Sequence, residues 1–324
     1  MFDTIFSFLD RHQSFIITTH DPSDPDGIGS EMVMATVLKA KGKKVKIINS
    51  SPIPKTMGFI QNVQEQIEIW DKKNYAGLLK DYALLILDTS EEFHLGHIKE
   101  AIKKVKETFI IDHHDPKPFC KLKGYVDSTA ASTAEITIAI AFSLGINLDA
   151  DTAKAVYTGL VSDSGFFSYP KTTTRTFNAA IKAIEWGAEP NHIYRNLMEN
   201  SSCAALLLQK QALANLEFYG GKKIALMILR NEDFQMAGAE FEETENIVNI
   251  PLRAKEIEVS ILIKEKPSGE IYCSMRSKGK VNVAKIAHEF GGGGHVTAAG
   301  FRRIIKIEEI VKKILNYVES HLKM

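Results

Sequence analysis

Two carboxylates and two imidazoles follow one another directly after an apolar segment of this sequence. Residues 108–111 favour a buried β-strand, and the polar group Asp112, His113, His114 and Asp115 comes immediately after them. In open α/β sheets, ligands bind beyond the carboxyl ends of the strands, where these side chains are expected. A surface turn could carry the same residues by chance, so the interpretation depends on how other predicted strands end.

The first predicted strand also ends in a polar loop. Residues 15–19 favour a buried strand, and the loop after them contains His20, Asp24 and Asp26 among prolines and glycines that argue against a helix. A histidine beside carboxylates suits a borderline divalent cation such as Mn²⁺. The alternative is an Asx-rich turn that caps the next helix, which we expect over residues 29–41. That alternative accounts for either aspartate but poorly for His20.

Two further aspartates stand at the ends of predicted elements. Asp88 follows the apolar strand at residues 83–87, and Asp163 follows a helical pattern at about residues 152–160. Small neighbours of Asp163 allow a metal or a phosphate to come close, although an ordinary helix-terminal turn would look the same. Six candidate metal ligands result: His20, Asp24, Asp26, Asp88, His113 and Asp163.

Six ligands of these types are too many for one ion and enough for two. Two divalent ions about 3.5–4 Å apart can bind both the attacking and the leaving oxygen of a phosphoryl transfer. A carboxylate between the ions would bridge them, and the cations would offset the mutual repulsion of the carboxylates. The pattern therefore predicts a two-metal centre for phosphoester chemistry.

Strand and helix patterns divide the chain into two parts. Up to about residue 187, short apolar strands alternate with helical segments, which indicates an α/β domain with a parallel sheet. A helical segment follows at about residues 191–213, and then two hairpins at residues 216–229 and 259–276. We expect a catalytic domain at 1–190, a helical linker at 191–205 and a smaller α/β domain at 206–324.

The second domain contains four consecutive glycines, residues 291–294, followed by His295. Their backbone N–H groups are expected to wrap an anion, with no side chains to block a nucleotide. A flexible linker is the alternative, but the predicted helix at 281–290 leads directly into the run. Arg276, next to Ser277, offers a guanidinium for bidentate phosphate contact, with a solvated surface charge as its alternative.

Charge and cysteine content exclude several classes of protein. Lys+Arg and Asp+Glu both number 40, so no overall positive field can hold long nucleic acid. Cys120, Cys203 and Cys273 form neither a zinc spacing nor a disulfide framework, which favours a reducing compartment. No segment approaches the roughly 20 apolar residues of a membrane span. We therefore expect a cytoplasmic protein with no membrane partner, and a homodimer stays open.

The motifs together resemble those of the DHH phosphoesterase superfamily, whose namesake triplet matches residues 112–114. The loop from His20 to Asp26 resembles its first motif, Asp88 its second and residues 163–165 its fourth. By this resemblance, one ion binds His20, Asp24 and Asp88, and Asp88 bridges to the other. The implied ligands of the other ion are Asp26, Asp88, His113 and Asp163.

The resemblance also implies catalytic roles for Asp88 and for His114, which would face the substrate phosphate. Asp112 would support the histidines without binding metal. Mn²⁺ is the implied metal, with Mg²⁺ or Co²⁺ as alternatives. One departure is His94, where many relatives carry arginine, so any phosphate contact of that loop stays open.

The second domain resembles the DHH-associated C-terminal domain, which binds the nucleotide end of the substrate. The implied substrate-binding residues are Arg276, Ser277, Gly292, Gly293, Gly294 and His295. The chain is most similar to the short NrnA-type members, which are oligoribonucleases and 3′-phosphoadenosine 5′-phosphate phosphatases. This resemblance implies that short RNA or DNA oligonucleotides, dinucleotides or 3′-phosphoadenosine 5′-phosphate bind in a cleft between the two domains.

Other members of the superfamily are alternatives. A RecJ-like single-strand exonuclease would be longer and carry extra nucleic-acid-binding domains, and a manganese pyrophosphatase would lack the glycine run. A cyclic-dinucleotide phosphodiesterase stays open, because the same cleft could serve it. From another class, a nucleotide-sensing module would bind without cleaving, although the full set of ligand residue types argues against it.

Overall fold

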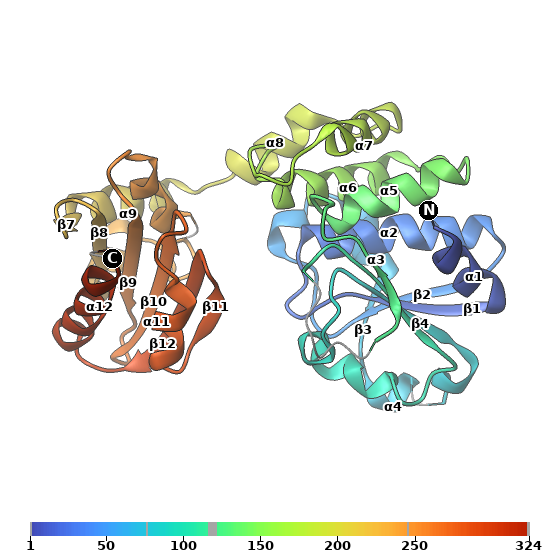
Figure 1. Ribbon diagram of the computed structural model, residues 1–324, viewed down its shortest axis with the longest axis horizontal. Coiled ribbons are helices and arrows are strands. Elements are labelled where there is room, and N and C mark those ends of the chain that lie inside the picture. The colour runs from blue at the N-terminus through green and yellow to red at the C-terminus, as the bar shows by residue number, and fades with distance from the viewer. Residues whose placement is uncertain (1, 76, 116–121, 245, 323–324) are drawn as a thin grey trace. The chain divides into compact units, whose positions relative to one another are not determined.

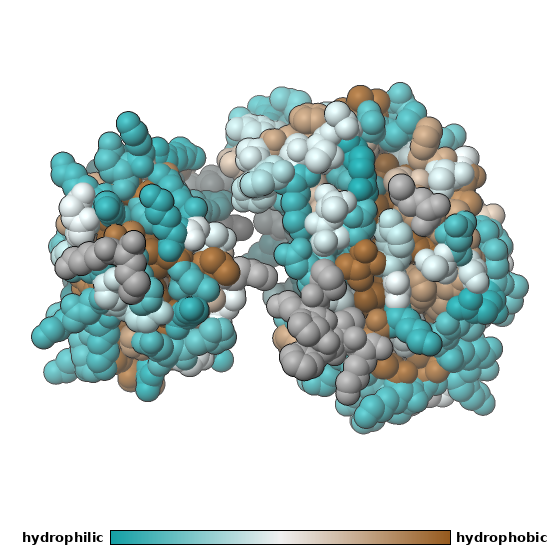
Figure 2. All heavy atoms as spheres, viewed as in Figure 1, coloured by the Kyte–Doolittle hydropathy of each residue, from teal (hydrophilic) through white to brown (hydrophobic). Residues whose placement is uncertain are grey.

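The computed structural model describes residues 2–75, 77–115, 122–244 and 246–322, apart from the side chains of Gln61 and His295. The chain forms two compact units, residues 1–199 and 200–324 (Figure 1). On the face of each unit seen in Figure 2, hydrophilic residues predominate and apolar residues gather in smaller patches. Among the described residues, no helix combines the length and apolar character needed to span a membrane.

The first unit contains a six-stranded parallel sheet in the order β3-β2-β1-β4-β5-β6. This arrangement confirms the α/β fold predicted from the sequence. The chain builds outward from β1 in one direction and then restarts at β4 on its other side. The carboxyl ends of β1 and β4 therefore lie at a topological switch point, where open α/β sheets bind ligands. The strands are β1 (Ser14–Thr18), β2 (Lys44–Asn49), β3 (Ile67–Ile69), β4 (Ala83–Leu87), β5 (Thr108–Asp112) and β6 (Gly124–Val126).

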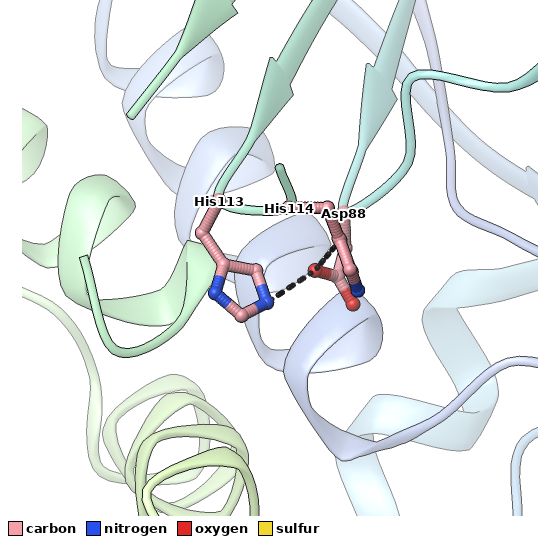
Figure 3. Close-up of side chains that lie close together, drawn as sticks. All are labelled: Asp88, His113 and His114. Carbon is pink, nitrogen blue, oxygen red and sulfur yellow. Dashed lines mark ion pairs between the residues drawn. The ribbon is translucent and has the colours of Figure 1, made fainter. Parts of the chain in front are cut away.

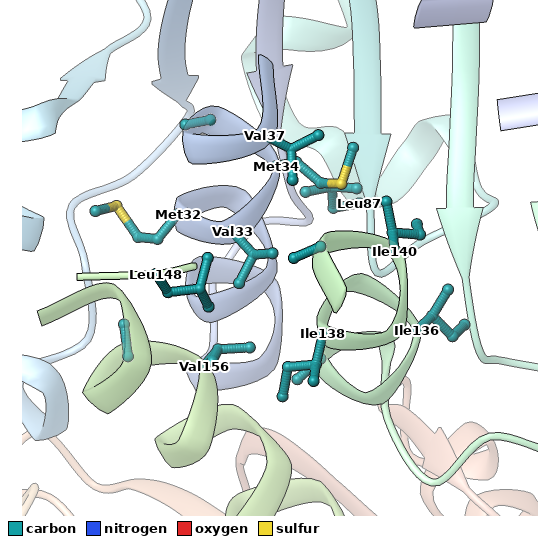
Figure 4. Close-up of a cluster of buried hydrophobic side chains, with 14 of the residues drawn as sticks. Met32, Val33, Met34, Val37, Leu87, Ile136, Ile138, Ile140, Leu148 and Val156 are labelled. Carbon is teal, nitrogen blue, oxygen red and sulfur yellow. The ribbon is translucent and has the colours of Figure 1, made fainter. Parts of the chain in front are cut away.

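Helices cover the sheet of the first unit. They are α1 (Asp3–Arg11), α2 (Pro25–Ala40), α3 (Gln61–Gln66), α4 (Lys72–Tyr75), α5 (Thr133–Ser143), α6 (Ala150–Asp163), α7 (Thr174–Glu185) and α8 (Pro190–Met198), with 3₁₀ turns at 55–57, 79–81 and 92–101. Helix α2 contacts strand β1 as well as helices α5 and α6. Most of its residues are buried, and Val33, Ile138 and Val156 illustrate the shared core in Figure 4. A helix buried on most sides needs apolar residues around its circumference, as the sequence of α2 provides.

Two glycines bring the backbones of α2 and α6 into direct contact. A Cβ atom added at Gly29 would lie 2.6 Å from Ala155 O, and one added at Gly159 would lie 2.7 Å from Pro25 O. Any larger residue would separate the two helices. This close approach fixes the position of the beginning of α2 relative to α6, which ends at Asp163.

The expectation that this helix begins near Gly29 was wrong, because α2 begins at Pro25. Proline is well tolerated at the first helical position, where its missing N–H would have no intrahelical partner. Asp24 is the N-cap residue, and its side chain accepts hydrogen bonds from the backbone N–H groups of Asp26 and Gly27. Pro25 and Gly27, two of the residues that argued for an irregular loop, therefore lie in the first helical turn.

The second unit contains a mixed six-stranded sheet in the order β11-β12-β10-β9-β8-β7. Both predicted hairpins form, because β7 pairs with β8 and β9 pairs with β10 in antiparallel fashion. Strands β8 and β9 pair in parallel, a relation that the hairpin patterns did not indicate. The strands are β7 (Glu217–Tyr219), β8 (Ile224–Leu229), β9 (Val259–Glu265), β10 (Glu270–Ser277), β11 (Gly293–His295) and β12 (Ala298–Ile304).

Helices of the second unit pack on this sheet. They are α9 (Cys203–Ala214), α10 (Asn231–Ala237), α11 (Val283–Glu289) and α12 (Ile307–Leu322), with a 3₁₀ segment at Ile247–Arg253. The helical stretch expected at 191–213 is interrupted between α8 and α9, where the two units meet in the sequence. Cys203 is exposed and Cys273 is buried, both as free thiols, whereas Cys120 lies outside the described residues.

Candidate metal centre

The six predicted ligands gather at the switch point of the first sheet. His20, Asp88 and His113 follow the carboxyl ends of β1, β4 and β5, and Asp163 is the last residue of α6. Asp24 and Asp26 lie at the beginning of α2. Their ligand atoms form groups in which all atoms lie within 4.8 Å of one another: His20, Asp24 and Asp88; Asp26, His113 and Asp163; and Asp88, His113 and His114.

Asp88 lies between the first two groups. Its Oδ2 atom is 3.4 Å from His20 Nε2, and its Oδ1 atom is 3.6 Å from His113 Nε2. Figure 3 shows Asp88 facing His113 and His114, which extend from the end of the neighbouring strand. Each carboxylate oxygen therefore faces a different set of ligands, as expected of a residue that bridges two ions.

The backbone and a threonine hold Asp88 in place. Its N–H donates to Ile111 O at 2.9 Å, and Thr133 Oγ1 donates to Asp88 Oδ1 at 2.8 Å. Its backbone is left-handed, with φ 62°, a conformation in which aspartate is commoner than most non-glycine residues. This conformation ends the run of β4 and places the carboxylate at the switch point.

In the first group, Asp24 uses its two oxygens differently. Oδ1 accepts the N–H groups of Asp26 and Gly27, both at 3.0 Å, while Oδ2 lies 3.4 Å from His20 Nε2. The helix-capping interpretation and the ligand interpretation therefore apply to separate atoms of one residue. Burial alone would lower the pKa of His20, but Asp24 and Asp88 outweigh it and raise the pKa to about 11.

His113 presents a nitrogen that a metal could use. Its Nδ1 donates to Ala130 O at 3.4 Å, which leaves the lone pair on Nε2, 3.1 Å from Asp163 Oδ2 and 3.9 Å from Asp26 Oδ2. Among the described residues, this buried Nε2 atom has no hydrogen-bond partner. An unpartnered imidazole nitrogen facing three carboxylates fits a divalent cation, because hydrogen bonding at the other nitrogen fixes the required tautomer.

Asp26, in the first turn of α2, is completely buried against the beginning of α5. Its Oδ2 accepts Thr133 N at 2.7 Å, and its Oδ1 accepts Ala134 N at 2.8 Å. Burial, followed by the charges of Asp88 and Asp163, raises the pKa of Asp26 well above its usual range. Carboxylates crowded in this way need cations or protons to coexist, so the charge of the cluster also fits metal ions.

His114 differs from the other histidine of the triplet in exposure and in its partner. Its side chain is 47% exposed, and its Nδ1 lies 2.7 Å from Oδ1 of Asp112, which also accepts His114 N at 3.1 Å. This hydrogen bond raises the pKa of His114 to about 9. A cationic imidazole at neutral pH, partly open to solvent and 3.8 Å from Asp88 Oδ1, can contact an anion at the metal centre.

Several supporting residues had no role assigned from the sequence. Ala130, Thr133 and Ala134 all lie in or next to the Ser/Thr/Ala-rich turn that precedes α5. The signal that could have found them is the helix cap itself, because Ser132 Oγ accepts Glu135 N at the start of α5. This cap uses only the N–H group of Glu135, and the other N–H groups of the first turn, those of Thr133 and Ala134, donate to Asp26.

His94 lies in the 3₁₀ segment after β4. Its carbonyl oxygen accepts Asp21 N at 2.5 Å, and its Nδ1 lies 3.5 Å from Glu91 Oε2. Its backbone therefore helps to hold the loop that begins with His20. The side chain is half exposed.

The predicted substrate residues of the second unit lie around one end of β10. Arg276 lies in β10 and its Nη1 donates to Met275 O at 3.0 Å. Ser277 is buried, and its Oγ donates to Val281 O at 2.7 Å. The backbone of His295 pairs with Ala298 of β12, whereas the His295 side chain lies outside the described residues.

The first half of the glycine run is hydrogen-bonded to helix α11. Gly291 N donates to His288 O at 3.0 Å and Gly292 N donates to Ala287 O at 2.8 Å, so these two N–H groups close helix α11. The expectation that the whole run has free N–H groups was therefore wrong. Gly293 and Gly294 continue into β11, which pairs with β12 and leaves the second half of the run at the edge of the sheet.

Comparisons with known proteins match two family domains to separate parts of the chain. Residues 14–160 match the DHH family N-terminal domain, and residues 221–320 match the DHHA1 domain. The chain is 27% identical over 309 residues to the bifunctional oligoribonuclease and PAP phosphatase NrnA of Thermus thermophilus, covering 94% of this chain and 89% of that protein. A probable NrnA of Streptococcus mutans is 25% identical over 327 residues, covering 98% and 99%.

One solved structure is similar over nearly its whole length. The exopolyphosphatase-related protein of Bacteroides fragilis superimposes with a TM-score of 0.88 at 25% identity, covering 99% of this chain and 97% of that one. Both units of the present chain thus have counterparts in a single known protein.

Proposed function

The chain belongs to the DHH phosphoesterase superfamily, and we propose that it is a two-metal enzyme that hydrolyses short oligonucleotides and 3′-phosphoadenosine 5′-phosphate. That it is a phosphoester hydrolase follows from its family and its named relatives. The observation that carries the two-metal proposal is Asp88, whose oxygens face His20 on one side and His113 on the other.

The proposed ligands are the two groups that share Asp88. One ion would bind His20, Asp24 and Asp88, and the other would bind Asp26, Asp88, His113 and Asp163. The mixed imidazole and carboxylate donors favour Mn²⁺ over Mg²⁺. When bound, two such ions would supply the Lewis acidity that phosphoester hydrolysis requires.

The residues around the metal centre would position and stabilise the substrate. His114, kept cationic by Asp112, would donate a hydrogen bond to a non-bridging phosphate oxygen as negative charge develops there. Asp112 would act through His114 by fixing the orientation of its ring. Thr133 would hold Asp88 at the angle at which each oxygen faces its own group.

The second unit would bind the nucleotide itself. Arg276 offers a guanidinium for a phosphate, and the backbone at Gly293 carries no side chain that could hinder close approach. Equal numbers of basic and acidic residues support short substrates, because long nucleic acid requires an extended positive surface. The names of the Thermus and Streptococcus relatives support the same substrate class.

Hydrolysis assays with Mn²⁺ test this proposal. A dinucleotide, a long single-stranded RNA, 3′-phosphoadenosine 5′-phosphate, cyclic di-AMP and pyrophosphate would be offered in parallel. We expect turnover of the dinucleotide and the bisphosphate, and loss of that turnover in Asp88→Asn. The matched control is Asp10→Asn, which removes an exposed carboxylate of α1. Preference for cyclic di-AMP would favour the cyclic-dinucleotide phosphodiesterase, and binding without turnover would favour the nucleotide sensor.

A further inference from the structure

A left-handed turn follows Asp163 almost directly. Gly165, Phe166 and Phe167 all have positive φ, at 56°, 52° and 65°. Left-handed backbone is unfavourable for residues with a Cβ atom and normally occurs at single residues, mostly glycine. Two consecutive phenylalanines in this conformation must be held there by the surrounding structure. Strained backbone of this kind concentrates at functional sites.

Ser164, which is buried, holds the turn. Its Oγ accepts Phe167 N at 3.1 Å, and its carbonyl oxygen accepts Ser168 N and Tyr169 N, both at 3.0 Å. Ser168 Oγ in turn donates to Gly165 O at 2.5 Å. The turn therefore has a fixed geometry, and the side chains that it carries point in defined directions.

The aromatic side chains of the turn point in different directions. The ring of Phe167 stacks on Phe177 at 5.1 Å and packs against the core. Phe166 and Tyr169 instead face solvent, with 38% and 57% of their surface exposed. The ring of Phe166 meets that of Tyr194, from α8, edge-on at 5.8 Å. Large exposed rings in a fixed turn require an explanation other than the hydrophobic core.

Tyr169 lies with one side against the turn itself. A methyl group added at Gly165 would come within 2.4 Å of the Tyr169 ring, so this glycine lets the ring pack against the backbone. More than half of the surface of Tyr169 is exposed, so the contact with the glycine leaves part of the residue open to solvent. A rigid aromatic ring with an open side is a surface for stacking.

Both ends of this segment contact His113, one of the candidate metal ligands. At one end, Asp163 Oδ2 lies 3.1 Å from His113 Nε2, and at the other Lys171 Nζ donates to His113 O at 3.5 Å. The exposed rings of Phe166 and Tyr169 lie between these two contacts in the sequence. The segment that carries the exposed rings is therefore fixed to a candidate metal ligand at both of its ends.

We propose that Phe166, Tyr169 and Tyr194 form a stacking surface for a nucleobase of the substrate whose phosphate lies at the metal centre. This inference rests on the proposed function, in that the substrate is a nucleotide, and assigns base binding to the first unit. Stacking uses the π face that every base possesses, so the surface tolerates any sequence. It favours substrates in which a base adjoins the scissile phosphate.

The test measures stacking directly in the full-length protein with Mn²⁺. The probe is a phosphorothioate-linked dinucleotide containing 2-aminopurine, whose fluorescence falls when the base stacks. The variants are Phe166→Gly, which also relieves the left-handed strain, and Tyr169→Ala. Phe142→Ala is the matched control, because it removes an exposed phenylalanine at the other end of α5 from Thr133. Phe166→Tyr keeps an aromatic ring.

We expect quenching in the wild type, the Phe142→Ala control and Phe166→Tyr. In the Phe166→Gly, Tyr169→Ala double variant we expect less quenching and roughly tenfold weaker binding, equivalent to about 1.4 kcal/mol. Equal quenching and Kd in the double variant and the wild type would overturn the proposal, as would absence of binding to the wild type.

Two further outcomes separate the possible explanations. A wild type that stacks the probe but hydrolyses no nucleotide would contradict the proposed function and support the stacking surface. A Phe166→Gly protein that changes oligomeric state in gel filtration, with unaltered probe binding, would assign the rings to an interface between copies of this chain and overturn the proposal.

Discussion

Gly159 of α6 contacts the backbone of Asp26, so that a methyl group at Gly159 would lie 2.7 Å from the Asp26 Cα atom. A glycine in one helix thus sets the position of a candidate ligand in another. Because Asp163 ends the same helix, the distance between two ligands of the second group depends on this contact. The packing of the core and the geometry of the metal centre are therefore coupled.

The variant Gly159→Ala should separate α2 from α6 and loosen the metal centre. Alanine is the better helix former, but overpacking in a rigid core costs about 1–3 kcal/mol. We expect a lower free energy of unfolding in urea together with weaker Mn²⁺ binding by calorimetry. Gly77→Ala is the control, because a Cβ there meets nothing within 4 Å. Unchanged metal affinity in Gly159→Ala would show that the centre does not depend on this contact.

Thr133→Val should weaken the metal centre while leaving the fold intact. The substitution removes the Oγ1 donor to Asp88 but keeps the backbone N–H that Asp26 accepts, and valine has nearly the same shape. Loss of a hydrogen bond that orients a metal ligand typically costs about 10–100-fold in affinity or activity. Calorimetric titration with Mn²⁺ and hydrolysis rates would measure both. Thr133→Ser, which retains a hydroxyl, should behave like the wild type, and equal losses in both variants would contradict this role.

Much of this arrangement can be predicted from local sequence. The strands ending near His20, Asp88 and His113 are short apolar runs closed by polar residues, and parallel strands bring such ends to one edge. Each candidate ligand can therefore be identified from the polar residues at the end of a single predicted element. The structure brings all six together in two neighbouring groups, with Asp88 Oδ1 of the first group 3.6 Å from His113 Nε2 of the second.

Other features depend on contacts that no local pattern encodes. Thr133 bonds to Asp88, 45 residues away, only because α5 begins at the switch point. Strand β6 has three residues and no apolar run, so its pairing with β5 decides its conformation. Glycine is depleted in β-strands, so the sequence does not indicate a strand at Gly293 and Gly294. They adopt strand conformation because they pair with β12.

Glu31, buried in α2, should make the stability of the chelator-treated protein depend on pH. Its Oε2 accepts Asn49 Nδ2 at 2.9 Å, and burial raises its pKa to about 8. The unfolded chain releases this proton near pH 4.5, whereas the folded chain keeps it until about pH 8. Stability should therefore fall as pH rises between these values, by a few kcal/mol at most.

Glu31→Gln provides the matching variant, because a neutral amide of the same shape cannot ionise. We expect it to be as stable as the wild type near pH 4.5 and more stable near pH 8 by urea denaturation. A wild type and a variant whose stabilities change in parallel across this range would contradict a raised pKa at Glu31.

Gly293→Ala should separate the structural and functional roles of the glycine run. A Cβ at Gly293 would meet only His288 Cε1 at 3.7 Å, and its φ is not positive, so the fold tolerates a methyl group. At Gly292 the Cβ would lie 2.2 Å from Gly300 O, which the hairpin cannot accommodate. We expect Gly292→Ala to lower Tm and Gly293→Ala to leave it nearly unchanged.

If a nucleotide approaches the backbone at 293, Gly293→Ala should still raise KM for the dinucleotide, by roughly tenfold for about 1.4 kcal/mol of lost contact. An unchanged KM with an unchanged Tm would show that substrate does not approach this backbone, and would assign the glycines to the hairpin alone.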